Sequence, residues 1–149
     1  MQEYFETQYV RKTKWAIFAN VVMAIVMLVI LGSLFVERND FVAKIFVLLM
    51  LSGVFVLFYF MKLEYKITEQ KVEYRYSPFH LKWRSIDRSE VDKISFVKYN
   101  ALTEYGGWGI KYGRNGVAYN VSGNYGIFVE LKSGKTMMLG TVKYKDLCK

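Results

Sequence analysis

The segment Ser133-Gly134-Lys135-Thr136 is the part of the chain that most resembles a nucleotide-binding motif. A phosphate-binding P-loop ends in this way, but it also needs a glycine five residues earlier and must open a helix. Val129 stands at that earlier position, and the segment joins two runs in which apolar residues alternate. We therefore predict a β-hairpin turn here rather than a phosphate site.

The glycine-rich stretch from Gly106 to Gly126 is the second candidate site, and two interpretations are open. Glycine and asparagine are ordinary turn residues, which favours turns and strand bends. Alternatively, glycines let a ligand approach the backbone closely, and neighbouring aromatic and polar side chains supply stacking and hydrogen bonds. The ligand or partner surface would then consist of Trp108, Tyr112, Arg114, Tyr119 and Asn120.

Residues suited to catalysis or metal binding are scarce. His80 is the sole histidine and Cys148 the sole cysteine, so neither has a second such residue with which to share a metal ion. The carboxylates occur mostly in expected turns or on the outward face of expected strands, whereas acid–base catalysis needs positioned pairs. We expect no catalytic residue, no metal site and no cofactor, and hence no enzyme.

Two long apolar runs dominate the first third of the chain. Residues 15–36 form an uncharged run of 22, and residues 45–61 form one of 17 that residues 41–43 extend if Lys44 reaches the headgroups. A chain of 149 residues has too little other material to bury two such helices. We predict a transmembrane helical hairpin over residues 15–61, with spans at 15–36 and about 41–61.

The charges that flank these runs predict the orientation of the hairpin. An excess of cations outside both spans places the two termini in the cytoplasm of a multi-pass protein of the cell inner (plasma) membrane. Residues 1–14 would be a cytoplasmic segment that either lies at the membrane interface or is disordered. The flanking cations are Arg11, Lys12, Lys14, Lys62 and Lys66.

The remaining residues, 62–149, have the two-residue period of half-buried β-strands. We expect a small antiparallel barrel or sandwich of about seven strands in a cytoplasmic domain, and we favour the barrel. Its strands include residues 79–83, while residues 100–107 form a loop. The domain holds 16 Lys and Arg against 9 Asp and Glu, a net charge of +7, which favours anionic lipid headgroups as partners. The cations are scattered and no recognition helix accompanies them, so we expect no nucleic-acid partner.

Several short motifs resemble an uncharacterised family of small bacterial membrane proteins. The resemblance implies two membrane helices followed by a pleckstrin-homology-like (PH-like) barrel of seven strands with a C-terminal capping helix, and it implies no activity. In this chain residues 146–149 are too few for the full helix, which would be short or missing. The motifs are Gly106-Gly107-Trp108-Gly109, Tyr119-Asn120-Val121-Ser122-Gly123-Asn124, Leu131-Lys132-Ser133-Gly134-Lys135 and Leu139-Gly140-Thr141.

These features predict a membrane-anchored cytoplasmic binding or scaffold module. Its partners would be the lipid bilayer, a protein or peptide, and anionic lipid headgroups. One alternative is a sensor of the anionic lipid surface. A third hypothesis, an oligomeric channel or transporter component, has less support because the two spans contain almost no polar residue.

Overall fold

The computed structural model describes residues 3–36, 40–113 and 116–144. The chain divides into two compact units. One unit is the helical hairpin, residues 10–61, and the other is a β domain formed by residues 1–9 and 62–149. The β domain is therefore discontinuous in sequence.

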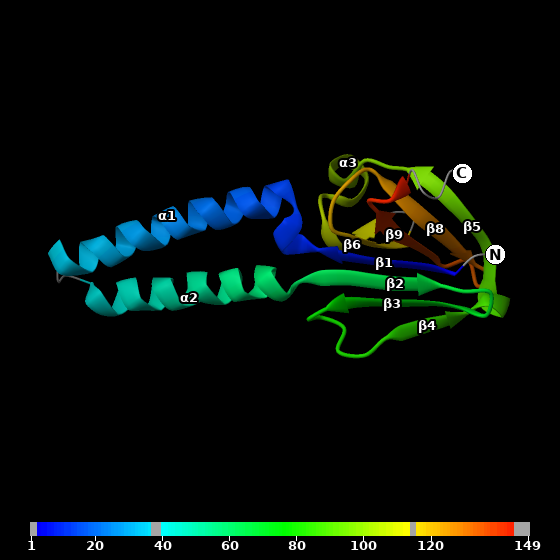
Figure 1. Cartoon of the computed structure of the whole chain (residues 1–149), viewed down its shortest axis with the longest axis horizontal. Helices are drawn as coiled ribbons and strands as arrows, with labels where there is room; N and C mark the ends of the chain where they lie inside the picture. Colours follow the sequence, from blue (N-terminus) through cyan, green and yellow to red (C-terminus); the bar gives the residue numbers. More distant parts are fainter. Residues whose placement is uncertain (1–2, 37–39, 114–115, 145–149) are drawn as a thin grey trace. The chain divides into compact units, whose positions relative to one another are not determined.

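The helical hairpin contains two long helices, α1 (Lys14–Val36) and α2 (Phe41–Phe60), which confirms the prediction of two long apolar helices (Figure 1). Most of their described side chains are exposed and only Ala16 and Leu48 are buried, and both helices are long and apolar enough to cross a membrane. This combination indicates a membrane-associated chain.

Short-range contacts fix the ends of the hairpin. The Thr13 hydroxyl accepts a hydrogen bond from the Ala16 amide at 3.3 Å and so caps the start of α1. Trp15 on α1 meets Phe58 on α2 edge to face, with ring centroids 5.7 Å apart. Across the helices, Lys44 Nζ lies 3.4 Å from the carbonyl oxygen of Ser33.

The β domain consists of two sheets. The first has the strand order β1-β2-β3-β4 and is entirely antiparallel. The second has the order β5-β8-β9-β7-β6. The strands are β1 (Tyr4–Tyr9), β2 (Lys62–Ile67), β3 (Lys71–Ser77), β4 (Arg84–Asp87), β5 (Val91–Lys98), β6 (Gly109–Gly113), β7 (Gly116–Asn120), β8 (Tyr125–Leu131) and β9 (Thr136–Thr141).

Strand β1 corrects the prediction for the N-terminal segment. Residues 4–9 are not disordered, because they pair along their whole length with β2, from Tyr4 opposite Ile67 to Tyr9 opposite Lys62. Pairing on this edge satisfies the backbone of β1 and buries alternate side chains. The strand lies about fifty residues before its partner, a separation that hides the pairing from any local pattern.

The expected closed antiparallel barrel also requires correction. The described strands form two separate sheets and number more than seven. One pair is parallel: β9 lies between β8 and β7 and runs parallel to β7, with Ala118 opposite Met138. The hairpin predicted from Ser133-Gly134-Lys135-Thr136 is confirmed by the antiparallel pairing of β8 with β9, and β6 and β7 pair in the same way.

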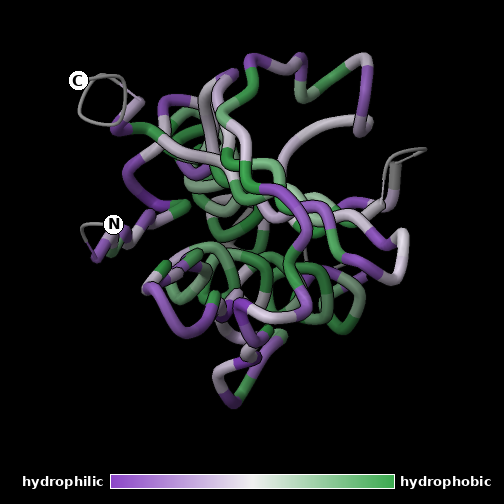
Figure 2. Tube along the Cα trace, turned by 90° about the vertical axis from the view of Figure 1, so that its right-hand side faces the viewer, coloured by the Kyte–Doolittle hydropathy of each residue, from purple (hydrophilic) through white to green (hydrophobic). Residues whose placement is uncertain are grey.

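The two sheets of the β domain pack face to face. Leu63, Tyr65 and Val72 from the first sheet are fully buried, as are Ile127, Val129 and Leu139 from the second. Hydrophilic and hydrophobic stretches are intermixed along the chain (Figure 2), and in the strands successive side chains point to opposite faces of the sheet, so that one face can be buried. The centroids of the Tyr74 and Tyr119 rings, one from each sheet, are 5.0 Å apart.

Two local predictions were wrong. Residues 79–83 form a loop, and β4 begins only at Arg84. Residues 101–105 form a short helix, α3 (Ala101–Tyr105), within the expected loop. The Asn100 side chain caps this helix by accepting from the amides of Leu102 and Thr103, and Gly106 ends it in a left-handed conformation. The expected C-terminal helix at 146–149 lies outside the described residues.

Candidate functional site

The five residues of the predicted glycine-rich surface do not lie together on the exterior. Tyr112 is 83% exposed, whereas Tyr119 and Asn120 are buried. Trp108 is partly buried against a second apolar cluster on the outer face of the five-stranded sheet, and Arg114 lies outside the described residues. That cluster consists of Tyr99, Ala101, Tyr105, Ala118 and Met138.

The buried members of this set hold the domain together. The Tyr119 ring packs against Tyr74 and, at 5.4 Å, against the edge of His80. Asn120 Oδ1 accepts a hydrogen bond from the Gly109 amide at 2.8 Å, joining β7 to the start of β6. These contacts favour the turn and strand-bend interpretation of the glycine-rich stretch.

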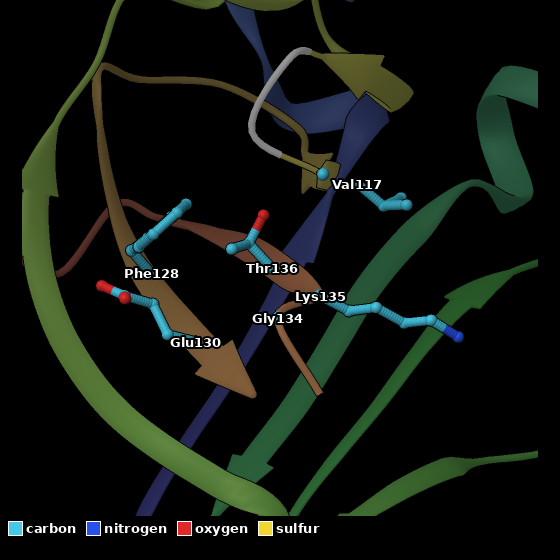
Figure 3. A pocket seen from close by; sticks show the side chains of 7 residues that line it. Val117, Phe128, Glu130, Gly134, Lys135 and Thr136 are labelled. Atoms are coloured by element: carbon cyan, nitrogen blue, oxygen red, sulfur yellow. The ribbon is translucent and has the colours of Figure 1, made fainter. Parts of the chain in front are cut away.

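An open depression with a volume of about 610 Å³ lies on the outer face of the five-stranded sheet. We call it the outer depression. Phe128 and Glu130 on β8 and Thr136 on β9 approach one another there, while the Lys135 side chain extends away from them (Figure 3). The depression is lined by Gly116, Val117, Phe128, Glu130, Gly134, Lys135 and Thr136.

Strand register explains the position of the outer depression. Phe128 pairs with Met138, and Glu130 pairs with Thr136, so these four side chains share the face of the sheet that points away from the core. The second apolar cluster covers Met138 at one end of this face. The other end stays open and offers an aromatic ring, a carboxylate and a hydroxyl group, which suits a peptide side chain that combines apolar and hydrogen-bonding groups.

A buried carboxylate joins the two sheets at a place that the sequence did not reveal. Glu6 on β1 is 1% exposed. Its Oε2 accepts hydrogen bonds from the hydroxyl groups of Tyr4, of Tyr65 at 2.7 Å and of Thr141 at 2.7 Å. Its Oε1 accepts from Gln8 Nε2 at 2.8 Å and from the Val142 amide at 2.9 Å. We call Tyr4, Glu6, Gln8, Tyr65 and Thr141 the Glu6 network.

The Glu6 network explains how a charged residue is tolerated in the core. Burial of a carboxylate is costly unless its lone pairs are satisfied, and here five donors surround it. Gln8 also donates to the Gly140 carbonyl at 2.7 Å. Side chains of β1 thus bind the end of β9 where no backbone ladder connects the two sheets. The only sequence signal was the alternation of Tyr4, Glu6 and Gln8, which resembles a solvent-facing strand.

Several tyrosines that are buried or partly buried in the domain have raised pKa values. Burial, followed by the hydrogen bond with Glu6, raises the pKa of Tyr4 to about 12. Burial and the nearby Glu6 charge raise the pKa of Tyr65 well above its usual range. Burial likewise raises the pKa of Tyr99 and of Tyr119 to about 12. These phenols therefore stay protonated in the fold at pH values at which a free phenol ionises.

We expect the β domain to lose stability as the pH rises above about 10. The unfolded chain releases its phenolic protons near that pH, whereas the folded domain holds them. Stability is therefore complete below pH 10 and is lost as the pH rises through the folded pKa values. Circular dichroism and tyrosinate absorbance of the detergent-solubilised chain should change together between about pH 10 and 12. Ionisation of all tyrosines with an unchanged circular dichroism spectrum would contradict this expectation.

The cations predicted to flank the membrane make local contacts. The Arg11 guanidinium lies 4.5 Å from the centroid of the Tyr59 ring, within the hairpin. In the β domain, Lys62 pairs with Glu64 at 3.1 Å and Lys66 with Glu3 at 3.4 Å. Lys12 lies in a short 3-10 helix before α1, and Lys14 is the first residue of α1. Acidic side chains thus offset the charges of Lys62 and Lys66.

Within residues 3–36, 40–113 and 116–144, no three His, Cys, Asp or Glu side chains are arranged to hold a metal ion. His80 is buried, and burial together with the Arg84 charge lowers its pKa. Its Nδ1 accepts a hydrogen bond from the Tyr76 amide at 3.3 Å. Cys148 lies outside the described residues. The arrangement of His80 is that of a residue that anchors a loop.

The described structure defines a membrane-associated chain in which a two-sheet β domain is interrupted by a helical hairpin. No family model, curated protein or solved structure matches the chain. The resemblance to the bacterial family with a PH-like domain therefore stays an expectation.

Proposed function

We propose that the chain is a membrane-anchored, non-enzymatic binding module whose β domain captures a protein or peptide at the outer depression. We further propose that the β domain is a PH-like domain in which the strands form two sheets, and that it lies on the cytoplasmic side of a bacterial inner membrane. The observation that carries the proposal is a binding-sized depression on a compact domain that is joined to two apolar helices without a linker.

The composition of the outer depression supports this choice. Phe128 is only partly buried there, and Glu130 and Thr136 offer one acceptor group and one hydroxyl group beside it. Because these residues project from paired strands of one sheet, their spacing is set by the sheet and needs no rearrangement on binding. A small polar rim around an aromatic residue is typical of sites that anchor one or two side chains of a partner.

We expect a photo-cross-linking amino acid at Glu130 to give a discrete cross-linked product in membranes of the native host. The same amino acid at Gln70 is the matched control, because Gln70 is exposed on the turn between β2 and β3, in the other sheet. The product at position 130 should decrease several-fold when Thr136→Arg fills the depression. Identical products from positions 130 and 70, or no product from position 130, would contradict the proposal.

Trp108→Ala would not test partner binding alone, although the sequence predicted Trp108 as part of a ligand or partner surface. Trp108 packs against the second apolar cluster, so its removal would change packing as well as the surface. Arg114 lies outside the described residues. Glu130 and Thr136 are the better positions because their side chains face the depression directly.

A further inference from the structure

The loop between β3 and β4 exposes three large apolar side chains. We call residues 78–83 the apolar loop. Phe79 is 56% exposed, Leu81 is 87% exposed and Trp83 is 42% exposed. Their alternation predicted a strand with these residues in the core, but in the structure they face outward. A contiguous group of this kind is expensive to leave in water and marks an interaction surface.

A buried histidine holds the apolar loop in this conformation. The His80 amide donates to the Tyr76 carbonyl at 2.8 Å, and its ring meets Tyr74 and Tyr119 edge to face. Because His80 points into the domain, the residues on either side of it must point outward. The exposed side chains are therefore presented by a fixed backbone.

Cations accompany the apolar side chains of the loop. Lys82 and Arg84 are exposed beside Leu81 and Trp83. The Arg75 guanidinium lies 5.0 Å from the centroid of the Trp83 ring while it is bonded to Glu64 at 2.6 Å. Tryptophan, phenylalanine and leucine together with lysine and arginine form the composition that binds at the boundary between anionic headgroups and acyl chains.

Strand register places the apolar loop at the end of the sheet where the chain joins the helical hairpin. Tyr9, the last residue of β1, lies opposite Lys62, the first residue of β2. Lys62 in turn lies opposite Ser77, the last residue of β3, directly before the loop. Tyr9 and Lys62, which flank the hairpin in sequence, and Ser77, which directly precedes the loop, are thus neighbours at one end of the four-stranded sheet.

We propose that the apolar loop docks on the bilayer surface, with Phe79, Leu81 and Trp83 inserted between anionic phospholipid headgroups and with Lys82 and Arg84 bound to their phosphates. The covalent attachment of this sheet edge to two apolar helices keeps the loop at a high effective concentration next to lipid. The proposal is independent of partner binding at the outer depression, which lies on the other sheet.

A fluorescent probe of polarity at position 81 tests the docking. The full chain, carrying Cys148→Ser and Leu81→Cys, is labelled and reconstituted in phosphatidylcholine vesicles with or without phosphatidylglycerol. We expect lipid-attached nitroxide to quench the probe about tenfold more than the same probe at Leu102→Cys, which is also exposed but lies on α3. The difference should be larger in the vesicles that contain phosphatidylglycerol.

Charge variants separate specific docking from general attraction. Lys82→Glu with Arg84→Glu should abolish the effect of phosphatidylglycerol on the probe. Lys93→Glu with Lys98→Glu makes the same change in net charge on exposed positions of β5 and should leave most of the effect. A probe at position 81 that is quenched by aqueous iodide as strongly as the probe at position 102 would overturn the proposal. A probe that is shielded only at high protein-to-lipid ratios would also overturn it, because it would show contact with a second copy of the chain.

Discussion

Replacement of Glu6 by alanine is expected to lower the free energy of unfolding of the β domain by roughly 3–5 kcal/mol. The substitution removes the acceptor of five donors, including the buried Tyr65 hydroxyl and the Val142 amide, and leaves them without a partner in a dry interior. It also breaks the side-chain connection between β1 and the end of β9. Thermal unfolding of the detergent-solubilised chain should show a Tm at least about 12 °C lower.

Glu73→Ala is the matched control for Glu6→Ala. Glu73 lies on β3 of the same sheet, but its side chain points outward and pairs with Lys71 at 2.8 Å. Loss of such a surface ion pair costs between zero and about 1 kcal/mol. The loss of stability in Glu6→Gln should lie between those of Glu6→Ala and Glu73→Ala. The amide keeps the shape of the side chain, but one acceptor becomes a donor that faces other donors. Equal Tm values for Glu6→Ala and Glu73→Ala would show that the Glu6 network does not stabilise the fold.

Replacement of Gly116 by alanine is the second substitution for which we expect a large effect, about 4 kcal/mol. Gly116 has a φ of +103°, and a Cβ atom there would lie 2.1 Å from the Thr136 carbonyl oxygen. The methyl group would therefore separate the start of β7 from the start of β9 as well as strain the backbone. Because Gly116 lines the outer depression, the same change should also weaken partner binding.

Gly134→Ala separates backbone strain from collision. Gly134 has a φ of +79°, but no atom lies within 4 Å of the position that its Cβ would occupy. Only the conformational penalty remains, roughly 1–2 kcal/mol. Chemical denaturation of both variants, followed by the fluorescence of the buried aromatic residues, should reproduce this order. A Gly116→Ala variant that is as stable as Gly134→Ala would show that β7 and β9 can separate without loss of packing.

Patterns with a local physical cause were read correctly from the sequence. The two apolar helices follow from uninterrupted hydrophobic runs, and the β8–β9 hairpin follows from Ser133 and Gly134 between alternating residues. The two-residue period that predicted strands from residue 62 onward is seen in β2, where Leu63, Tyr65 and Ile67 are buried. In each case the residues that determine the structure are close together in the sequence.

Features that depend on distant partners were missed. The pairing of β1 with β2 and the parallel pairing of β7 with β9 join segments whose sequences contain no signal for each other. Residues 79–83 do alternate between apolar and polar types, but the apolar side chains are not the buried ones. The ring of His80 is buried instead, because it packs against Tyr74 and Tyr119. For the site, the alternation of Val117, Tyr119 and Val121 already indicated that Tyr119 faces the core, and this signal outweighs the presence of nearby glycines.

The interrupted β domain has a consequence for the order of events during synthesis. Strand β1 leaves the ribosome before residues 10–61, and at about 5–20 residues per second its partner β2 follows roughly 3 to 10 seconds later. Thr141, which completes the Glu6 network, follows Glu6 by 135 residues. Strand β1 must therefore remain without its strand partner while the whole helical hairpin is synthesised. Synthesis of the two apolar helices thus precedes the pairing of the two pieces of chain from which the β domain is assembled.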